Sequence, residues 1–254
     1  MDISSFQSQR KRTGSVNCPS GTASTRSQSH TGAAAKRWQP KSAKLNNPTP
    51  HPAELALRQT EPDTLLRQKA LAKAQMGFYT EAIVLFNQLI KRNPINANDF
   101  SNRGLVYFQS GQADAAILDY NRALDLNPRL DSAYNNRANY YAAQGRFLEA
   151  ILDYDIALDL NPMNVRAWIN QGITFRDLEM YDRAVESFEA ALHLGRLEGH
   201  IYAERGRAYH LRGDWNCAIA DYQKAIAELP ELPASERLRL QVEGWLSELL
   251  EPLF

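Results

Sequence analysis

The residues of this sequence that can form directional polar contacts recur at a fixed interval. Asn102, Asn136 and Asn170 follow one another at spacings of 34 residues. An asparagine side chain carries both a donor and an acceptor, so it can pair with a backbone amide whatever sequence is bound. The spacing therefore favours recognition of an extended polypeptide. The alternative interpretation is that these asparagines only solvate an exposed helix.

Signatures of catalysis or metal binding are missing from the sequence. It contains no phosphate-binding glycine loop, nucleophile elbow or zinc-type Cys/His spacing. His200 and Glu204 can share a helix face, but His210 lies about 15 Å further along such a helix and cannot complete a metal site. Cys18 and Cys217 form no metal-binding spacing. We expect no enzyme activity, no metal or other cofactor and no small-molecule substrate.

The same 34-residue interval also predicts the secondary-structure units that position these asparagines. One position of the 34-residue period holds only alanine, and a second, four residues later, holds only Tyr or Phe. These two sets are Ala82, Ala116, Ala150, Ala184 and Ala218, and Phe86, Tyr120, Tyr154, Phe188 and Tyr222. A period of this length indicates a stack of similar supersecondary units rather than a closed globule.

The third unit shows what each of them contains. Tyr134, Ala138 and Tyr141 share one face of a predicted helix, and Gly145 suits a turn that needs a positive φ. A second apolar stripe of helical spacing runs over residues 147–158, and a proline then ends the unit. Each unit is therefore predicted to be a helical hairpin.

This pattern resembles the tetratricopeptide repeat (TPR), and the resemblance covers 170 of the 254 residues. The repeats are 63–96, 97–130, 131–164, 165–198 and 199–232. The resemblance implies an all-α fold, an α-solenoid of five antiparallel helical hairpins. Repeat 4 departs from the pattern at Glu179, where the other repeats have glycine, and at Arg196, where they have proline. We expect an irregular junction between repeats 4 and 5, where Gly195 can end the helix.

The flanks of the repeats differ from them in composition. Residues 1–52 are rich in Ser, Thr and basic residues, which predicts a disordered tail. Residues 53–62 are interpreted as a lead-in helix or linker, and residues 233–254 as a C-terminal capping helix for the last repeat. Residues 1–60 hold nine Lys or Arg and two acidic residues, a net charge of +7, and the remainder carries −7. The neutral total thus combines a basic tail with an acidic solenoid.

A correlation between the repeats predicts a set of ion pairs. Position 7 of the repeat is arginine in repeats 2, 3 and 5, and position 23 is aspartate in those same repeats. Repeats 1 and 4 lack both. The two positions can face each other within a hairpin, so we predict the pairs Arg103–Asp119, Arg137–Asp153 and Arg205–Asp221. We interpret these residues as structural rather than ligand-binding.

The resemblance also implies where a partner binds. In TPR arrays the first helix of each repeat lines a concave groove with positions 2, 5, 6, 9, 12 and 13. We call the side chains at these positions the A-helix face. On it the resemblance places Asn102, Asn136 and Asn170, with Asn135 and Asn139 beside them. Its far end carries Arg166, Arg176, His200, Arg207 and His210, against Asp177 and Glu204. This end favours a carboxylate or an acidic segment, and the alternative interpretation is an ordinary solvated surface.

The function that follows is a non-catalytic scaffold or adaptor that binds an extended segment of a partner protein. The repeats look most like bacterial, cyanobacterial and plastid TPR proteins, some of which assist assembly of photosynthetic or membrane complexes. The alternative is a nucleic-acid-associated regulator that uses the basic tail, although its cation density makes nucleic acid a weak candidate. No apolar run is long enough to span a bilayer. We expect a cytoplasmic protein, or a stromal one if the tail is a plastid transit peptide, and leave its oligomeric state open.

Overall fold

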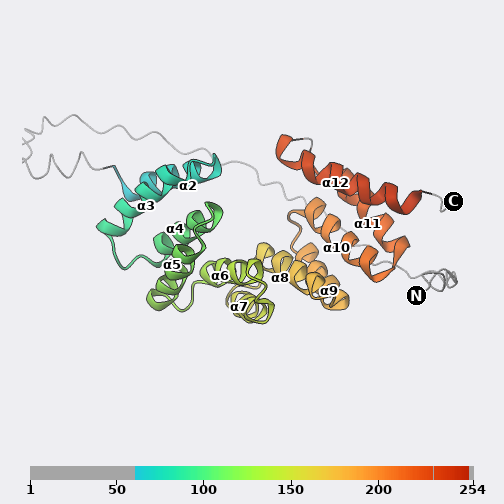
Figure 1. Ribbon diagram of the computed structural model, residues 1–254, viewed down its shortest axis with the longest axis horizontal. Helices are drawn as coiled ribbons and strands as arrows, with labels where there is room; N and C mark the ends of the chain where they lie inside the picture. The colour runs from blue at the N-terminus through green and yellow to red at the C-terminus, as the bar shows by residue number, and fades with distance from the viewer. Residues whose placement is uncertain (1–60, 231, 252–254) are drawn as a thin grey trace, which may run out of the picture. The chain divides into compact units, whose positions relative to one another are not determined.

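The structure is a computed structural model that describes residues 61–230 and 232–251. These residues form eleven helices and no strand (Figure 1). The helices are α2 (Asp63–Gln75), α3 (Tyr79–Arg92), α4 (Ala97–Gln109), α5 (Ala113–Leu126), α6 (Asp131–Ala143), α7 (Phe147–Leu160), α8 (Val165–Asp177), α9 (Tyr181–His193), α10 (Glu198–Arg212), α11 (Trp215–Glu228) and α12 (Pro233–Leu250). The predictions for residues 1–52 and 53–60 lie outside the described residues.

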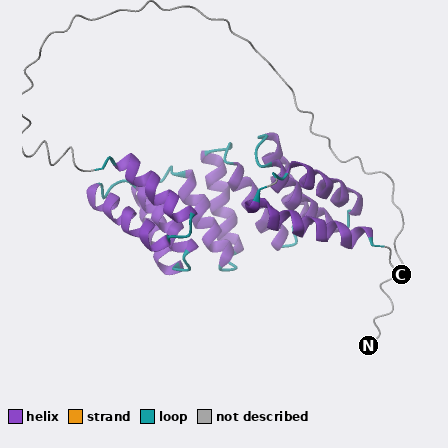
Figure 2. Ribbon diagram, turned by 90° about the horizontal axis from the view of Figure 1, so that it is seen from above, coloured by secondary structure: helices purple, strands orange, loops and turns teal. Residues whose placement is uncertain are grey.

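The helices pair into five hairpins, which confirms the predicted all-α solenoid. In each repeat we call the first helix A (α2, α4, α6, α8 and α10) and the second helix B (α3, α5, α7, α9 and α11). Each A helix packs against the B helix that follows it, and each B helix packs against the next A helix. The connections are short loops, drawn in teal in Figure 2. The A helices of repeats 1 to 4 begin at the first residue of each predicted repeat.

The recurring alanines and rings form the interior of every hairpin. All five alanines at position 20 are fully buried, and so are the Phe and Tyr rings at position 24. The rings lie against position 8 of helix A. A Cβ atom added at Gly104 would come within 2.8 Å of the Tyr120 ring, and one added at Gly172 within 2.7 Å of the Phe188 ring. Glycine at these two positions therefore allows the close approach of helices A and B.

The turn inside repeat 4 keeps the geometry of the other repeats without their glycine. Gly77, Gly111, Gly145 and Gly213 have φ values between 71° and 93°. Glu179 occupies the same place with a φ of 61°. A side chain in this left-handed region costs about 1–2 kcal/mol. Repeat 4 therefore keeps the turn despite having Glu179 in place of glycine, at the cost of local backbone strain.

The junction between repeats 4 and 5 is irregular, as expected from Arg196. Helix α9 ends at His193, and Gly195 follows with a φ of 62°. Leu197 is also left-handed, with a φ of 60°, and α10 starts directly after it. Helix α10 begins at Glu198, one residue before the predicted boundary of repeat 5.

Helix α12 covers the last hairpin. It packs against α11, and Val242 is fully buried. The ring of Trp245 lies 5.7 Å from that of Tyr222, between centroids, so the final helix covers the ring at position 24 of repeat 5. An end helix of this kind shields the apolar face that the last unit of a solenoid would otherwise expose.

Candidate functional site

The A helices lie against one another along the stack. Helix α4 contacts α2 and α6, and α8 contacts α6 and α10. These contacts bring the A-helix face of one repeat next to that of the following repeat. An extended segment lying across several repeats would therefore meet a continuous row of side chains from successive A helices.

We call the row of position-6 asparagines, Asn102, Asn136 and Asn170, the asparagine ladder. Hydrogen bonds connect two of its three members to neighbouring A helices. Asn136 Nδ2 donates to Ser101 Oγ at 3.2 Å, and Asn170 Nδ2 donates to Asn135 Oδ1 at 3.3 Å. Both position-6 asparagines remain half-buried, whereas Asn135 is buried. Asn102 is half-buried and forms no side-chain hydrogen bond within the described residues. Asn136 Oδ1 also accepts from Asn135 Nδ2 at 3.4 Å, so the Asn102 amide and the Asn170 side-chain oxygen are the ladder groups without a partner in the described residues.

Asn139 has a different role from the ladder. Its Oδ1 accepts a hydrogen bond of 2.6 Å from the hydroxyl of Tyr154, the ring residue at position 24. Burial raises the pKa of this tyrosine well above its ordinary value. In repeat 2 the buried hydroxyl of Tyr120 finds no partner among the residues that the structure describes. Asn139 thus anchors a core side chain from the A-helix face.

The predicted basic end is mostly engaged within the protein. Arg176 pairs with Glu204 and also donates to Asp177 at 2.9 Å. The Arg207 guanidinium lies over the Trp245 ring, with Cζ 5.0 Å from its centroid. These contacts leave less positive charge available to an acidic ligand than the sequence suggested.

Three members of that end remain: His200, which is half-buried, His210 and Arg166. The His210 ring nitrogen Nδ1 lies 3.2 Å from the Tyr222 hydroxyl. Burial and the charge of Arg207 lower the pKa of His210. Arg166 is exposed and has no ion pair in the described part of the chain. Whether these residues bind a partner stays a prediction.

The three predicted Arg–Asp pairs are confirmed. In each pair the guanidinium donates through Nε and Nη2 to both carboxylate oxygens, at distances from 2.6 to 2.9 Å. The Arg205–Asp221 pair is the most buried, with side chains 4% and 3% exposed. Hydrogen bonding to the aspartate raises the pKa of Arg103 and Arg137. These pairs join helices A and B, and their aspartates are buried.

One buried pair was not predicted from the sequence. Arg67 of α2 donates through Nε and Nη2 to the carboxylate of Asp99 on α4, at 2.6 and 2.8 Å. Asp99 is buried. The pair joins repeat 1 to repeat 2 and occurs once, so a comparison between repeats carries no signal of it.

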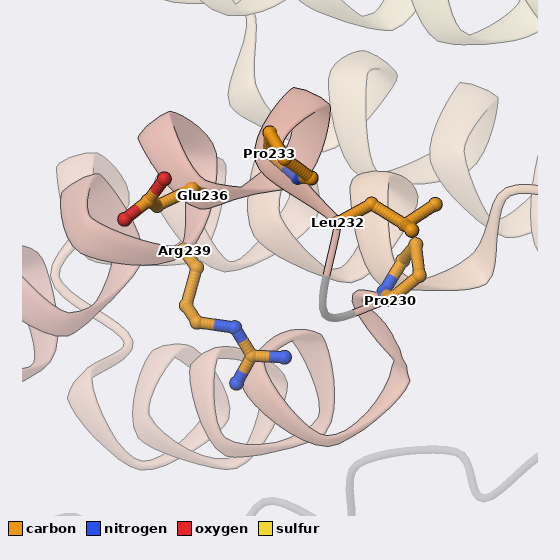
Figure 3. Close-up of a pocket in the computed structure, with 5 residues that line it drawn as sticks. All are labelled: Pro230, Leu232, Pro233, Glu236 and Arg239. Carbon is orange, nitrogen blue, oxygen red and sulfur yellow. The ribbon is translucent and has the colours of Figure 1, made fainter.

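The described residues include no cluster of metal ligands, and one of their surface hollows lies at the C-terminal end of the repeats. In residues 61–230 and 232–251, no three His, Cys, Asp or Glu are grouped to hold a metal ion. A hollow of about 380 Å³ lies at the turn between α11 and α12 (Figure 3). Arg239, one of its lining residues, donates to the Leu229 carbonyl oxygen at 2.6 Å and is thus already engaged. None of the described helices is long and apolar enough to cross a membrane.

Comparison with family models identifies the repeats. A model described as TPR repeat matches residues 104–145, and one described as tetratricopeptide repeat matches residues 135–194 and 169–233. The chain belongs to the tetratricopeptide repeat family. TPR proteins generally bind other proteins and are generally non-catalytic. No curated protein matches the chain significantly.

Solved structures share the TPR fold at low sequence identity. A thermophilic TPR protein of Thermus thermophilus is 20% identical, with a TM-score of 0.64 over 73% of this chain and 99% of that one. PilF of Pseudomonas aeruginosa is 19% identical, with a TM-score of 0.61 over 74% and 91%. PilW, a type IV pilus biogenesis factor, is 18% identical, with a TM-score of 0.63 over 74% and 94%. At these identities the likeness shows the fold alone.

Proposed function

We propose that this TPR protein is a scaffold or adaptor that binds an extended segment of a partner protein along its A-helix face. The observation that carries the proposal is the row of half-buried amides at Asn102, Asn136 and Asn170 on three A helices that contact one another in turn. Each of these three asparagines carries a donor and an acceptor group, and the capacity that the protein itself does not use can pair with a passing backbone. The bound segment is held by main-chain contacts, and its side chains add specificity.

The arrangement favours a scaffold in the assembly or regulation of a larger complex. Main-chain recognition by repeated amides tolerates different sequences, which suits a protein that holds partners in place. Among the structural neighbours, PilW is described as a pilus biogenesis factor. A role in assembling a membrane or photosynthetic complex belongs to this proposal as its more specific form.

The proposal is tested by affinity purification from the cells in which the protein is native. The wild type is compared with a triple variant, Asn102→Ala, Asn136→Ala and Asn170→Ala. A matched control changes Leu118 and Leu152, which are exposed on the B helices, to alanine. Partner recovery should fall at least about tenfold for the asparagine variant only, the loss that corresponds to about 1.4 kcal/mol of binding free energy. Equal recovery by the triple variant and the wild type would sink the proposal, provided that circular dichroism shows both folded.

The alternative function, nucleic-acid binding through the basic tail, involves residues outside the described part of the chain. It predicts DNA or RNA binding that weakens steeply with salt and disappears when residues 1–52 are removed. The scaffold proposal predicts that partner binding survives this deletion.

A further inference from the structure

Repeat 4 lacks the Arg–Asp pair but keeps the surroundings of that pair. In repeats 2, 3 and 5 the guanidinium at position 7 lies between two rings, at positions 4 and 11. The distance from Cζ to each ring centroid is between 5.5 and 5.9 Å. The rings are Phe100 and Tyr107, Tyr134 and Tyr141, and Tyr202 and Tyr209.

The same guanidinium also reaches position 25 of the preceding repeat. Arg103 Nη1 donates to Asn87 Oδ1 at 2.6 Å, and Arg137 Nη1 donates to Asn121 Oδ1 at 2.9 Å. In repeat 5 the corresponding contact is an ion pair of 3.7 Å with Glu189. Two rings, one carboxylate and one polar side chain from the neighbouring repeat therefore form a guanidinium site three times in this chain.

In repeat 4 these positions are present without the guanidinium. Trp168 and Phe175 supply the rings, and Asp155 supplies a carboxylate at position 25 of the preceding repeat. Position 7 is Gln171, whose Nε2 donates to Asp155 Oδ1 at 2.7 Å. Ser187 Oγ at position 23 donates to Gln171 Oε1 at 3.1 Å. The glutamine is shorter than arginine and carries no charge.

A cavity of about 580 Å³ opens at this place. It is lined by both rings, by the side chains at positions 7 and 23, and by Asp155, Asp159, Glu186 and Arg183, among others. The charged groups of the lining are three carboxylates and one guanidinium, that of Arg183, whose Cζ lies 4.2 Å from the Phe175 ring centroid. The charged residues of the lining carry a net charge of −2.

The carboxylate of Asp155 is partly desolvated in this cavity. Burial raises its pKa, although the hydrogen bond from Gln171 and the charge of Arg183 act in the opposite direction. Asp155 is exposed at the mouth of the cavity, and its Oδ2 atom has no hydrogen-bond partner within the described residues. The cavity therefore combines two aromatic walls with a carboxylate oxygen that is available to a donor.

We propose that this cavity binds the side chain of an arginine from a partner protein. The guanidinium lies between Trp168 and Phe175 and pairs with Asp155. The guanidinium of Arg205, in repeat 5, pairs in the same way with Glu189 of the preceding repeat. A planar guanidinium stacks on rings and donates in a fork, so arginine is favoured over lysine. The lining positions 4, 7 and 11 are not part of the A-helix face, so this site is separate from the proposed groove.

The probe for this site is N-acetyl-arginine methylamide, added to the full-length protein. The reporter is the indole N–H of Trp168, which donates to the Pro162 carbonyl oxygen at 2.9 Å and gives an assignable signal in an ¹⁵N NMR spectrum. A saturable shift at millimolar probe concentration is expected. The neutral isostere N-acetyl-citrulline methylamide should bind at least tenfold more weakly. Absence of a saturable shift, or equal binding of the two probes, overturns the proposal.

Two variants change the site itself, and a third, outside it, is the control. Gln171→Arg combined with Ser187→Asp rebuilds the Arg–Asp pair of repeats 2, 3 and 5. Its own guanidinium should then fill the site and abolish the shift of the Trp168 signal. Asp155→Asn keeps the hydrogen bond from Gln171 but removes the charge, and it should weaken the arginine probe at least fivefold. The triple asparagine variant should bind the probe normally. Unchanged binding by the rebuilt pair or by Asp155→Asn contradicts the assignment.

Discussion

The hydroxyl groups of the position-24 tyrosines differ in how they are satisfied. Tyr154 donates to Asn139 at 2.6 Å, whereas the Tyr120 hydroxyl is buried without a partner in the described residues. Phe86 and Phe188 occupy the same position in other repeats and are equally buried. A ring without the hydroxyl therefore fits this place in the hairpin.

We predict opposite effects of removing these two hydroxyls. Tyr120→Phe should raise the free energy of unfolding by about 1 kcal/mol, because it removes an unsatisfied buried polar group. Tyr154→Phe should lower it by about 1 kcal/mol, because Asn139 loses its donor. Urea denaturation of both variants measures the difference. A destabilised Tyr120→Phe would show that its hydroxyl has a partner, such as a buried water.

The strained backbone at Glu179 gives a second prediction about a single residue. Glu179→Gly should raise the free energy of unfolding by about 0.5–1 kcal/mol, because glycine adopts a positive φ without steric cost. Gly111→Ala places a side chain at the equivalent turn, where φ is 80°, and should lower stability by about 1 kcal/mol. Thermal denaturation compares them. If both changes shift the Tm in the same direction, the strain is misassigned.

In the hairpins of repeats 2, 3 and 5, the Arg–Asp pair joins helix A to helix B, and its burial differs between repeats. The Arg205 side chain is 4% exposed, whereas Arg103 and Arg137 are 18% and 21% exposed. Water can compensate a broken pair only where it reaches the remaining charge.

The cost of breaking a pair should therefore follow its burial. Asp221→Ala should lower the free energy of unfolding by about 3–5 kcal/mol, because it leaves the buried Arg205 guanidinium unpaired. Asp153→Ala should cost about 1–3 kcal/mol, since Arg137 is better solvated and its hydrogen bonds to charged partners are partly replaced by water. Chemical denaturation gives both values. Equal costs would mean that burial does not set the strength of these pairs.

Much of the hairpin architecture could be predicted because identical units fold alike. The alanines at position 20, the rings at position 24 and the three Arg–Asp pairs recur, so comparison between copies reveals them. The Arg67–Asp99 pair occurs once and joins two repeats, which leaves no internal comparison. The early start of α10 depends on backbone conformations at Gly195 and Leu197 that the sequence does not specify.

The candidate site was less predictable than the fold. Repetition located Asn102, Asn136 and Asn170, but not the hydrogen bonds that Asn136 and Asn170 make across A helices. The sequence placed Asp177 and Glu204 near Arg176 but did not show that Arg176 pairs with both, nor that Arg207 lies over Trp245 of α12. Contacts between units depend on the three-dimensional stacking, which a single repeat does not encode.

At the scale of the whole molecule, the central claim is that a partner lies along the A-helix face rather than on the B helices. A photo-crosslinking residue tests this directly. It is placed at Gln109 or Arg166, exposed on A helices, or at Leu118 or Leu152, exposed on B helices. After irradiation in the native cell, we predict a crosslinked partner polypeptide from the A-helix positions and none from the B-helix positions. Crosslinks from the B-helix positions alone would contradict the account.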